Sequence, residues 1–234
     1  MERYCRQSSM IGGSGQKRLK DSTAAVIGCG GLGCNVMTHL ASAGVGNIII
    51  ADDQTVEMSN LNRQFIYSEE DIGKRKVRIS AEWIRRMSPD AEVTELETHI
   101  DDQNSSKMGK CDVIIDCLDN YASRMAVNRY AFNNNIPLVH GGVESMFGQV
   151  TVIIPKRTPC LECILPPRNV NETASISPVV GMIGAIQATE AIKLLTGSFS
   201  PLSGKLLTVD VSCNKYVTTD VKKREGCACC SGKD

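Results

Sequence analysis

A glycine-rich loop between an apolar run and a helical pattern is the feature that most constrains the fold. Its glycines have the spacing G-x-G-x-x-G and are Gly28, Gly30 and Gly33. Residues 24–27 before the loop are apolar, and residues 32–43 after it carry apolar side chains at helical spacing. A second apolar run, residues 47–51, is followed by Asp52. A strand, a glycine turn, a helix, a strand and an acid in this order are the fingerprint of dinucleotide-binding folds, so we predict a nucleotide site at the start of this helix.

The chemistry of this loop indicates a nucleotide without telling which one. Glycines let the backbone approach a phosphate closely, and the N-terminus of the following helix favours negative charge. Asp52 stands where a carboxylate accepts hydrogen bonds from ribose hydroxyls. The alternative is a set of glycines that only make a tight turn. Cys29 and Cys34, beside the loop, are interpreted as small packing residues rather than as reactive thiols.

The rest of the first half continues the alternation of strands and helices. Expected strands are residues 92–96, 111–117 and 137–139, and expected helices are residues 77–87 and 120–133. Residues 1–22 are expected to form an arm with a short helix, and residues 54–75 are polar and irregular. This alternation predicts a parallel sheet with helices on both of its faces.

The pattern changes after about residue 141. Residues 148–155 and 205–217 are predicted to be longer strands with hairpin character, and residues 179–196 an apolar helix. We therefore expect an α/β fold in which a Rossmann-like, mostly parallel sheet continues into a mixed or antiparallel C-terminal half. One domain is expected, with a half that binds the nucleotide and a half that binds a second ligand. These halves are residues 1–140 and 141–234 of a single domain, 1–234.

Charge and composition argue against several classes of protein. The chain has 26 Lys and Arg against 26 Asp and Glu, so no net field favours nucleic acid or an anionic membrane. We find no signal peptide and no apolar run that approaches the roughly 20 residues of a membrane-spanning helix. The 11 cysteines are odd in number and unevenly spaced, so a disulfide framework is not expected. These features predict a cytoplasmic protein without a nucleic-acid or membrane partner.

Cations and amides follow Asp52 closely in the sequence. Those that we single out are Ser59, Asn60, Arg63, Gln64 and Lys76. An enzyme that transfers hydride binds two bridging phosphates and has little use for several cations here. A triphosphate under attack does gain from them, because charge builds on its oxygens and fixed cations stabilise that charge. A solvated helix face is an equal explanation for the neighbouring cations Lys74, Arg75, Arg78, Arg85 and Arg86.

A second polar group closes the fourth expected strand. Asp119 and Asn120 follow this apolar run, and the carboxyl ends of parallel strands are where such sheets bind ligands. The Asp119 carboxylate could hold Mg²⁺, a cation that takes oxygen ligands and bridges phosphates. The alternative role of Asp119, as the N-cap of the following helix, does not exclude the first.

Two C-x-x-C pairs are the strongest local signal in the chain. They are Cys160 with Cys163, and Cys227 with Cys230. Each pair presents two thiolates, and the four together make a tetrahedral zinc site without an open position, so we predict a structural zinc. A disulfide or a redox motif is the alternative, which we disfavour because neither pair is expected at the start of a helix in a βαβ unit. Cys229 is an extra thiol that could replace a neighbouring ligand.

Histidine contributes no recognisable catalytic pattern. His39, His99 and His140 have no spacing that suggests a triad or a metal site. We interpret them as packing or surface residues, and we expect no acid–base constellation from them.

An ordered set of motifs resembles the ThiF/MoeB/HesA family, prokaryotic relatives of ubiquitin-activating enzymes. The motifs are R-Y-C-R-Q, G-C-G-G-L-G, D-D-Q-T-V, S-N-L-N-R-Q, I-G-K-R-K-V, D-C-L-D-N, C-L-E-C, G-M-I-G-A-I-Q-A-T-E-A-I-K and C-A-C-C. The set spans nearly the whole chain and is far more specific than any single piece. Its pattern is most similar to the molybdopterin-synthase adenylyltransferase group of the family.

The resemblance implies an adenylation reaction. ATP with Mg²⁺ and the C-terminal Gly-Gly carboxylate of a small ubiquitin-like carrier protein would give an acyl-adenylate and pyrophosphate. In such relatives the activated carrier usually takes up sulfur, and an external sulfur donor is expected because no sulfurtransferase-like domain is appended. The resemblance also implies a homodimer in which Arg6 reaches the γ-phosphate bound by the partner subunit. The second half of the chain would bind the carrier.

The resemblance further assigns roles by motif. Gly31 would lie against the nucleotide, Asp52 would hold the ribose, and Asp119 would bind Mg²⁺. The side chains implied to face the phosphates are Asn60, Arg63 and Lys76. Attack by a carboxylate on the α-phosphorus needs little proton transfer, so positioning and charge neutralisation can supply most of the acceleration. Two positions depart from the family: Gln54 replaces a common acid, and Val170 stands where some relatives carry a cysteine that accepts the carrier.

Other functions remain open at this stage. A nicotinamide- or flavin-dependent oxidoreductase would use the same glycine fingerprint, and heat protection by dinucleotides rather than by ATP with Mg²⁺ would identify it. A non-catalytic module could dock a ubiquitin-like tail without activating it, although Arg63, Lys76 and Asp119 argue against this. A relative that activates a carboxylate on a peptide or on tRNA is a third possibility, and the lack of a basic stripe disfavours tRNA.

Overall fold

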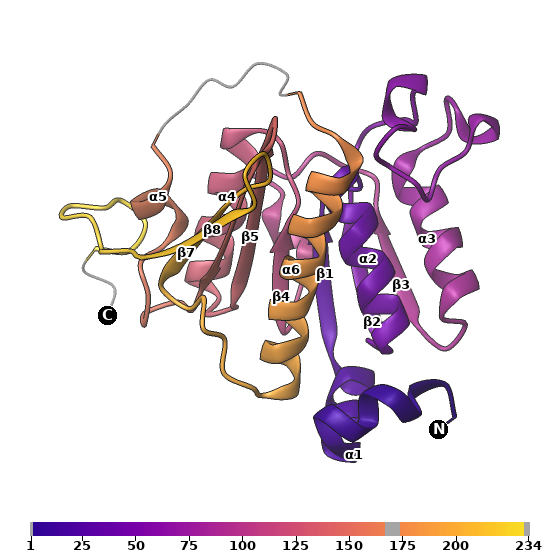
Figure 1. Ribbon diagram of the computed structural model, residues 1–234, viewed down its shortest axis with the longest axis horizontal. Helices are drawn as coiled ribbons and strands as arrows, with labels where there is room; N and C mark the ends of the chain where they lie inside the picture. The colour runs from indigo at the N-terminus through magenta and orange to yellow at the C-terminus, as the bar shows by residue number, and fades with distance from the viewer. Residues whose placement is uncertain (1, 167–173, 232–234) are drawn as a thin grey trace.

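In the computed structural model, which describes residues 2–166 and 174–231, eight strands form one sheet. The strand order is β3-β2-β1-β4-β5-β6-β7-β8. The strands are β1 Thr23–Ile27, β2 Asn47–Ala51, β3 Glu92–Leu96, β4 Val113–Asp116, β5 Leu138–Glu144, β6 Phe147–Ile153, β7 Lys205–Asp210 and β8 Lys215–Asp220. Neighbours from β3 to β5 pair in parallel, and neighbours from β5 to β8 pair antiparallel. This mixed sheet confirms the predicted α/β fold (Figure 1).

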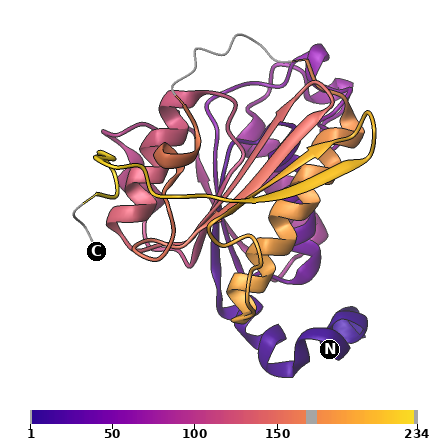
Figure 2. The same cartoon turned by 60° about the vertical axis from the view of Figure 1, so that its left-hand side comes forward.

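Helices cover both faces of the sheet (Figures 1 and 2). They are α1 Cys5–Asp21, α2 Gly31–Ala43, α3 Lys76–Met87, α4 Tyr121–Asn133, α5 Leu161–Ile164 and α6 Ser177–Thr196. On one face, α2, α3 and α6 bury a core that includes Leu40 and Ile84. On the other face, α4 buries Met125 in a cluster that contains Ile114 of β4. The sheet is therefore the middle layer of three.

The strand order reverses between β1 and β4, whose carboxyl ends lie side by side. Ile27, the last residue of β1, pairs with Asp116, the last residue of β4. β1 leads through the glycine loop into α2, and β4 leads through residues 117–120 into α4. Both loops lie at the upper end of the molecule in Figure 1. Because ligands bind at such a switch point in open α/β sheets, the fold brings together two loops that the sequence predicts to be functional.

The N-terminal helix α1 lies at the opposite, lower end of the molecule (Figure 1). Gly12, Gly13 and Gly15 lie within the helix, which is kinked at Gly12 with a φ of 72°. Nε2 of Gln7 donates a hydrogen bond of 2.7 Å to the carbonyl oxygen of Ala43, the last residue of α2. α1 is thus anchored to the end of α2 that is farthest from the glycine loop.

Helix α6, which the sequence analysis expects as an apolar helix at residues 179–196, begins at Ser177. It has 20 residues and its most apolar stretch has a mean hydropathy of 1.3, so by length and composition alone it could cross a membrane. Half of that stretch is buried within the fold, where α6 packs against α2 and beside β5. This burial is typical of a core helix.

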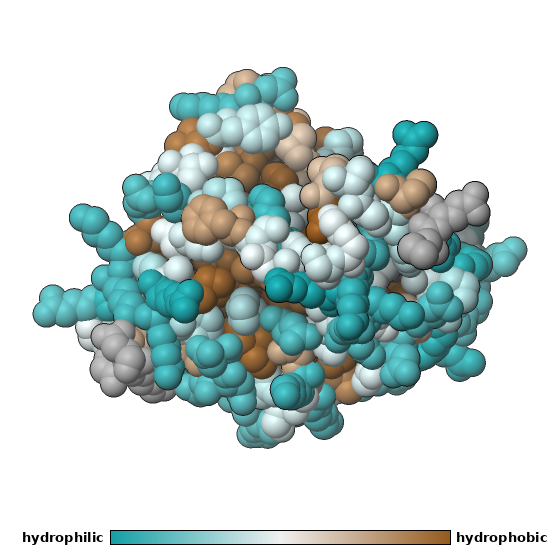
Figure 3. Space-filling model, turned by 90° about the horizontal axis from the view of Figure 1, so that it is seen from below, coloured by the Kyte–Doolittle hydropathy of each residue, from teal (hydrophilic) through white to brown (hydrophobic). Residues whose placement is uncertain are grey.

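Seen from the α1 end, the surface is largely polar, with apolar patches scattered between the polar side chains (Figure 3).

The expected elements are present, with some shifted ends. β5 extends to Glu144, well beyond the expected 137–139, because its hairpin with β6 continues the pairing as far as Phe147. Val170, which the sequence analysis names as a departure from the family, falls outside the described residues.

Candidate functional site

The glycine loop between β1 and α2 requires glycine at two positions. Gly28 has a φ of 101°, and a Cβ there would lie 2.7 Å from the carbonyl oxygen of Cys117 on the neighbouring loop. A Cβ on Gly33 would lie 1.9 Å from the carbonyl oxygen of Gly28. Gly31 is the first residue of α2 and packs against Val180 of α6. The backbone can therefore approach a phosphate at the start of α2, where N–H groups lack helical partners.

Asp52 follows β2, and one of its carboxylate oxygens ties it to the glycine loop. Oδ2 accepts a hydrogen bond from the N–H of Cys29 at 2.7 Å, and Oδ1 accepts one from the N–H of Gln54 at 2.8 Å. Burial raises the pKa of Asp52, and these two hydrogen bonds oppose the rise. The carboxylate thus lies beside the loop, as a ribose-binding acid does in folds of this kind.

Lys76 begins α3 and is almost fully buried, with 3% of its surface exposed. Its Nζ donates a hydrogen bond of 2.7 Å to Oε1 of Gln54. Gln54, the departure from the family pattern, therefore gives the ammonium a neutral partner. A neutral amide does not offset the charge of an ammonium group, so the Lys76 side chain is suited to an anionic ligand.

The polar segment after Asp52 turns through the short 3-10 helix Met58–Asn60. Asn60 is buried, and its Oδ1 accepts a hydrogen bond of 3.1 Å from the N–H of Glu57. Arg63 is half-buried, and its Nη1 donates to the carbonyl oxygen of the exposed Ser59 at 2.9 Å. The backbone of this turn therefore orients Asn60 and Arg63.

Gln64 carries an orphaned polar atom beside the glycine loop. Its side chain is 3% exposed, and a Cβ on Gly30 would lie 3.9 Å from its Nε2. Among the described residues, no hydrogen-bond partner of its Oε1 is present. Buried polar atoms are normally hydrogen-bonded, so this acceptor fits a donor group of a bound nucleotide.

The loop after β4 presents Asp119 and Asn120 in different ways. Asn120 is the N-cap of α4, because its Oδ1 accepts a hydrogen bond of 2.9 Å from the N–H of Ser123. The alternative role of Asp119 as N-cap is therefore wrong, because the helix begins one residue later than that role requires. The Asp119 side chain is exposed, which leaves its carboxylate open to a cation.

Beneath this loop lies a buried polar network that the sequence analysis missed. Nδ1 of His140 lies 2.7 Å from Oδ2 of Asp116, and both side chains are fully buried. Nε2 of His140 lies 3.3 Å from Nη1 of Arg124 and 3.2 Å from Nε2 of Gln149. Arg124 also donates to the carbonyl oxygen of Leu118 through Nε at 3.1 Å and through Nη2. His140 is thus a specific hydrogen-bonding residue rather than ordinary packing.

The pKa shifts in this network follow from burial and charge. Burial alone would raise the pKa of Asp116, but the charge of Arg124 and the hydrogen bond from His140 lower it overall. Burial and the charge of Arg124 lower the pKa of His140. A signal was available in the sequence: Asp116 ends an apolar run, and a buried acid requires a partner. That partner, Arg124, lies on the following helix.

Arg6 is not brought near the other predicted site residues within one chain. It lies on α1 and is exposed, at the end of the molecule away from the glycine loop. A helix of the length of α2 is about 20 Å long, and it separates α1 from the loop. Arg6 can therefore serve a nucleotide site only in another subunit.

The four predicted zinc ligands lie together. Their sulfur atoms all lie within 4.8 Å of one another, in the set Cys160, Cys163, Cys227 and Cys230. Contacts across the two pairs are 3.6 Å between Cys160 and Cys227 and 3.4 Å between Cys163 and Cys230. The four thiols suit a tetrahedral Cys₄ zinc site without an open position. Cys160 is the N-cap of the short helix α5, which the sequence analysis did not expect, but α5 is not part of a βαβ unit.

Four other buried thiols, those of Cys29, Cys34, Cys111 and Cys117, are poor nucleophiles. Cys29 and Cys34 pack within the core beneath the glycine loop, as predicted from their size. Burial raises the pKa of Cys34 to about 12 and that of Cys111 to about 12. The pKa of Cys117 is also raised, first by burial and then by the charge of Asp116. Thiols with such values are protonated at neutral pH.

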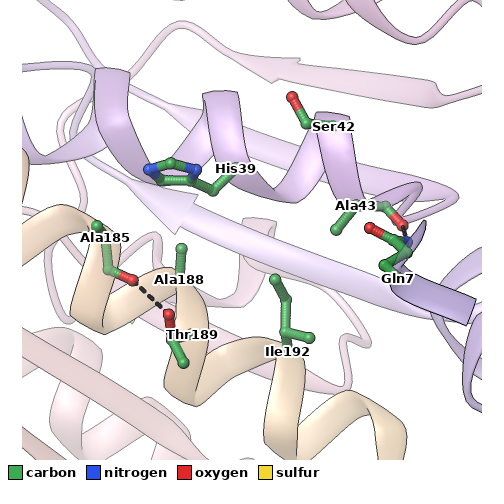
Figure 4. A pocket seen from close by; sticks show the side chains of 8 residues that line it. All are labelled: Gln7, His39, Ser42, Ala43, Ala185, Ala188, Thr189 and Ile192. Carbon is green, nitrogen blue, oxygen red and sulfur yellow. Dashed lines mark hydrogen bonds between the residues drawn. The ribbon is translucent and has the colours of Figure 1, made fainter. Parts of the chain in front are cut away.

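A shallow hollow of about 280 Å³ lies away from these groups, between α2 and α6 (Figure 4). It is lined by Gln7, His39, Ser42, Ala43, Ala185, Ala188, Thr189 and Ile192. A second hollow, of about 370 Å³, lies beside α4 and includes Ser123 and Arg129. The first has no cation among its lining residues apart from a histidine, so it does not suit a nucleotide. The candidate nucleotide site is the surface formed by the glycine loop and the loop after β4.

The fold and the site together define a Rossmann-like α/β protein with a candidate nucleotide site at its switch point and a four-cysteine cluster. The chain belongs to the ThiF family, whose family profile matches residues 4–229. This match confirms the resemblance seen in the sequence motifs.

Several named adenylyltransferases are similar over nearly the whole chain. The molybdopterin-synthase adenylyltransferase of Escherichia coli is 36% identical over 239 residues, which cover 98% of this chain and 96% of that protein. The sulfur carrier protein ThiS adenylyltransferase of Escherichia coli is 34% identical over 241 residues, covering 99% and 96%. The SAMP-activating enzyme E1 of Haloferax volcanii is 35% identical over 240 residues, covering 98% and 88%.

Solved structures show the same architecture. Escherichia coli MccB in a crystal structure with ATP superimposes with a TM-score of 0.89 at 26% identity, covering 98% of this chain and 74% of that one. A second MccB structure, with MccA-N7isoASN, gives a TM-score of 0.89 at 25% identity, covering 97% and 74%.

Proposed function

We propose that this protein is an ATP-dependent adenylyltransferase that activates the C-terminal glycine carboxylate of a small ubiquitin-like carrier protein. One observation carries the proposal: the glycine loop, Asp52 and the buried Lys76 meet at the switch point of a ThiF-family sheet. The named relatives support it, because they are adenylyltransferases that include a sulfur carrier protein ThiS adenylyltransferase. The products are an acyl-adenylate and pyrophosphate.

The proposed reaction needs positioning and charge neutralisation more than proton transfer. A carboxylate oxygen of the carrier attacks the α-phosphorus of ATP, and the bond from that phosphorus to pyrophosphate breaks. Lys76 and Arg63 neutralise the charge that grows on the phosphate oxygens, and Asn60 and Gln64 hydrogen-bond to the nucleotide. Asp52 binds the ribose hydroxyls. Asp119 would hold Mg²⁺, which when bound would supply positive charge that offsets the charge of the phosphates.

We assign carrier binding to residues 141–234 and nucleotide binding to residues 1–140. Gly148 of β6 faces Ile183 of α6, so its neighbour Phe147 points to the face that α6 leaves open. Val217 of β8 pairs with Thr208 of β7, which pairs with Gln149 of β6. Gln149 is two positions from Phe147, so Val217 lies on the same open face. Phe147 is 56% exposed and Val217 is 39% exposed. Exposed apolar side chains on an open sheet suit a protein partner.

Three further properties belong to the same proposal. Zinc, held by the four cysteines of the cluster, pins residues 227–230 to α5 and has a structural role. Two chains form a homodimer, and an external donor supplies sulfur to the activated carrier. The protein is cytoplasmic, a compartment that suits its 11 unpaired cysteines.

Exchange of radioactive pyrophosphate into ATP tests this function. We expect exchange that depends on a carrier from a panel of small proteins ending in Gly-Gly. Asp119→Ala should abolish it, and Arg63→Ala or Lys76→Ala should each reduce it on the order of 10²-fold. Asp90→Ala, a change to an exposed acid far from the switch point, is the control. Undiminished exchange in all three site variants would rule out this mechanism, and binding of a carrier without any exchange would indicate a non-catalytic docking module.

A further inference from the structure

We propose that His140 is a positioning residue that fixes the loop carrying Asp119, through Asp116 and Arg124. This inference rests on the proposed function for its catalytic consequence, but its structural part does not depend on any ligand. Asp116, at the end of β4, and His140, on β5, are paired in the sheet register. Both side chains lie on the face that α4 covers, where Arg124 reaches them from the first turns of that helix.

The contacts of His140 define a single arrangement of hydrogen bonds. Two donors, Nη1 of Arg124 at 3.3 Å and Nε2 of Gln149 at 3.2 Å, face Nε2 of the imidazole. That nitrogen must therefore be an acceptor without a proton. The other nitrogen, Nδ1, lies 2.7 Å from the carboxylate of Asp116 and carries the proton that it donates. The ring is neutral and connects an acid to a cation.

This neutral ring holds two groups that together fix the backbone of Leu118. Oδ1 of Asp116 accepts a hydrogen bond of 3.0 Å from the N–H of Leu118. The guanidinium of Arg124 donates to the carbonyl oxygen of the same residue through Nε, at 3.1 Å, and through Nη2. The residue before Asp119 is thus held at its N–H and at its C=O, each by a side chain that contacts His140.

The position of Asp119 therefore depends on a ring that no substrate touches. Asp119 is exposed and follows Leu118 directly, so its carboxylate is placed by the backbone of that residue. If His140 lost its hydrogen bonds, Asp116 would lose one of its donors and Arg124 one of its acceptors, and Leu118 would be held less firmly. A buried donor or acceptor left without a partner destabilises its surroundings, and the loop is the part free to move.

Three substitutions separate hydrogen bonding from packing. His140→Ala removes both, His140→Leu keeps an apolar volume without hydrogen bonds, and His140→Gln keeps one amide donor and one acceptor. His39→Ala, which changes an exposed histidine on α2, is the matched control. Hydrogen–deuterium exchange of the Leu118 amide, followed by NMR in the ligand-free protein, reports directly on the loop.

We expect His140→Ala and His140→Leu to speed exchange of the Leu118 amide on the order of tenfold, and His140→Gln and His39→Ala to leave it nearly unchanged. In pyrophosphate exchange, the first two should raise the KM for ATP with Mg²⁺ by about tenfold with a smaller change in kcat. A ¹⁵N imidazole spectrum of the wild type should show one protonated nitrogen, Nδ1.

Protection of Leu118 in His140→Leu equal to that of the wild type would overturn the proposal, since packing alone would then suffice. An imidazole protonated at Nε2 would overturn it as well. Failure of the proposed function would look different: the wild type would show no pyrophosphate exchange with any carrier, while the effects on the Leu118 amide would stand.

Discussion

Gln54 shows, at the scale of one residue, how a departure from the family pattern is accommodated. Where the family resemblance leads us to expect an acid, this chain has an amide whose Oε1 accepts a hydrogen bond from Nζ of the buried Lys76 at 2.7 Å. The backbone N–H of the same residue donates to Asp52. Gln54 therefore joins the candidate ribose acid to the candidate phosphate cation.

Removal of this amide should weaken both the fold and the site. We expect Gln54→Ala to lower the free energy of unfolding by about 1–3 kcal/mol, because a buried ammonium loses its hydrogen-bond partner. Gln54→Glu keeps an acceptor and should retain stability and pyrophosphate exchange. Urea unfolding and the exchange assay measure the two effects, with the exposed Gln103→Ala as control. A Gln54→Ala protein as stable as the wild type would contradict the assigned role of the contact.

The histidine–aspartate pair should make stability depend on pH. The pKa of His140 is lowered in the fold, so below about 6.5 the unfolded chain binds a proton that the native state does not. The contribution of His140 to the free energy of unfolding is complete above that pH. It is lost as the pH falls toward the pKa that His140 has in the folded protein. The pKa of Asp116 is also lowered, so its contribution is present above about 3.9 and is lost in more acidic solution.

We therefore expect the free energy of unfolding to decrease as the pH is lowered from 7 to 5. His140→Gln should remove up to about 1.4 kcal/mol per pH unit of this slope, since one titrating group is deleted. The pH dependence that Asp52 contributes has the opposite sign. Burial raises the pKa of Asp52, so its contribution to the free energy of unfolding decreases as the pH rises. Urea unfolding at several pH values gives the slopes, and identical slopes in wild type and variant would argue that another group titrates there.

At the scale of elements, the cysteine cluster connects two segments that share no strand pairing. Helix α5 supplies Cys163, and Cys160 caps it, while the other pair belongs to the segment after β8. The buried Asn128 of α4 contacts both segments: its Oδ1 accepts from the N–H of Leu161 at 2.8 Å, and its Nδ2 donates to Cys229 at 3.3 Å. The cluster is therefore also attached to the helix that begins at the candidate nucleotide site.

Loss of one cysteine ligand of the proposed zinc should lower the stability of the fold more than it lowers the rate of adenylation. We expect metal analysis to find one zinc per chain, and Cys160→Ala to lower Tm by several degrees while turnover per folded molecule changes little. Cys213→Ser, which alters an exposed thiol in the turn between β7 and β8, should leave both unchanged. A native protein that is fully folded and free of metal would contradict this prediction.

The arrangement of elements could be predicted from the sequence where local patterns decide it. The bounds of β2 and β3 match the expected residues, because short apolar or alternating runs between turn residues leave few other choices. The length of β5 could not be predicted, since it is set by pairing with β6 rather than by its own residues. Helix α6 begins two residues before the expected residue 179, because Pro178 is accommodated in its first turn.

The candidate site also combines features that the local sequence predicts with features that depend on distant contacts. Local motifs were sufficient to identify the glycine loop, Asp52 and the cysteine pairs, because the spacing itself reflects the chemistry. The partners of Lys76 and His140 come from contacts made across the fold, between residues 22 and 24 positions apart. No local pattern contains that information. The sheet register pairs His140 with Asp116, and an isolated bridge between Thr55 and Arg75 brings Gln54 beside Lys76.

At the scale of the whole molecule, the position of Arg6 requires a second chain if this side chain is to contact ATP. α1 is fixed to the far end of α2 by hydrogen bonds from Gln7 and Gln16 to the carbonyl oxygen of Ala43. The exposed guanidinium is suited to a terminal phosphate by its bidentate geometry. The proposed homodimer places it at the partner's site.

Complementation between two inactive variants tests this arrangement. A dimer of one Arg6→Ala chain and one Asp119→Ala chain has one site with both groups intact. Equal mixing should therefore restore about a quarter of wild-type exchange activity, because half of the dimers are mixed and half of their sites are whole. Recovery measured after demonstrated subunit exchange is the readout, and its absence would indicate that Arg6 acts within its own chain or not at all.

The distance between the two cysteine pairs along the sequence also sets the time between their appearances during synthesis. Cys160 and Cys227 are 67 positions apart, so the first pair waits for the second during synthesis. At usual rates of translation this interval is roughly 3 to 13 seconds. During that time two thiols meant for a metal are open to oxidants and to unrelated partners. Because metal binding needs reduced thiols, a reducing environment during this interval would keep the first pair able to bind its metal.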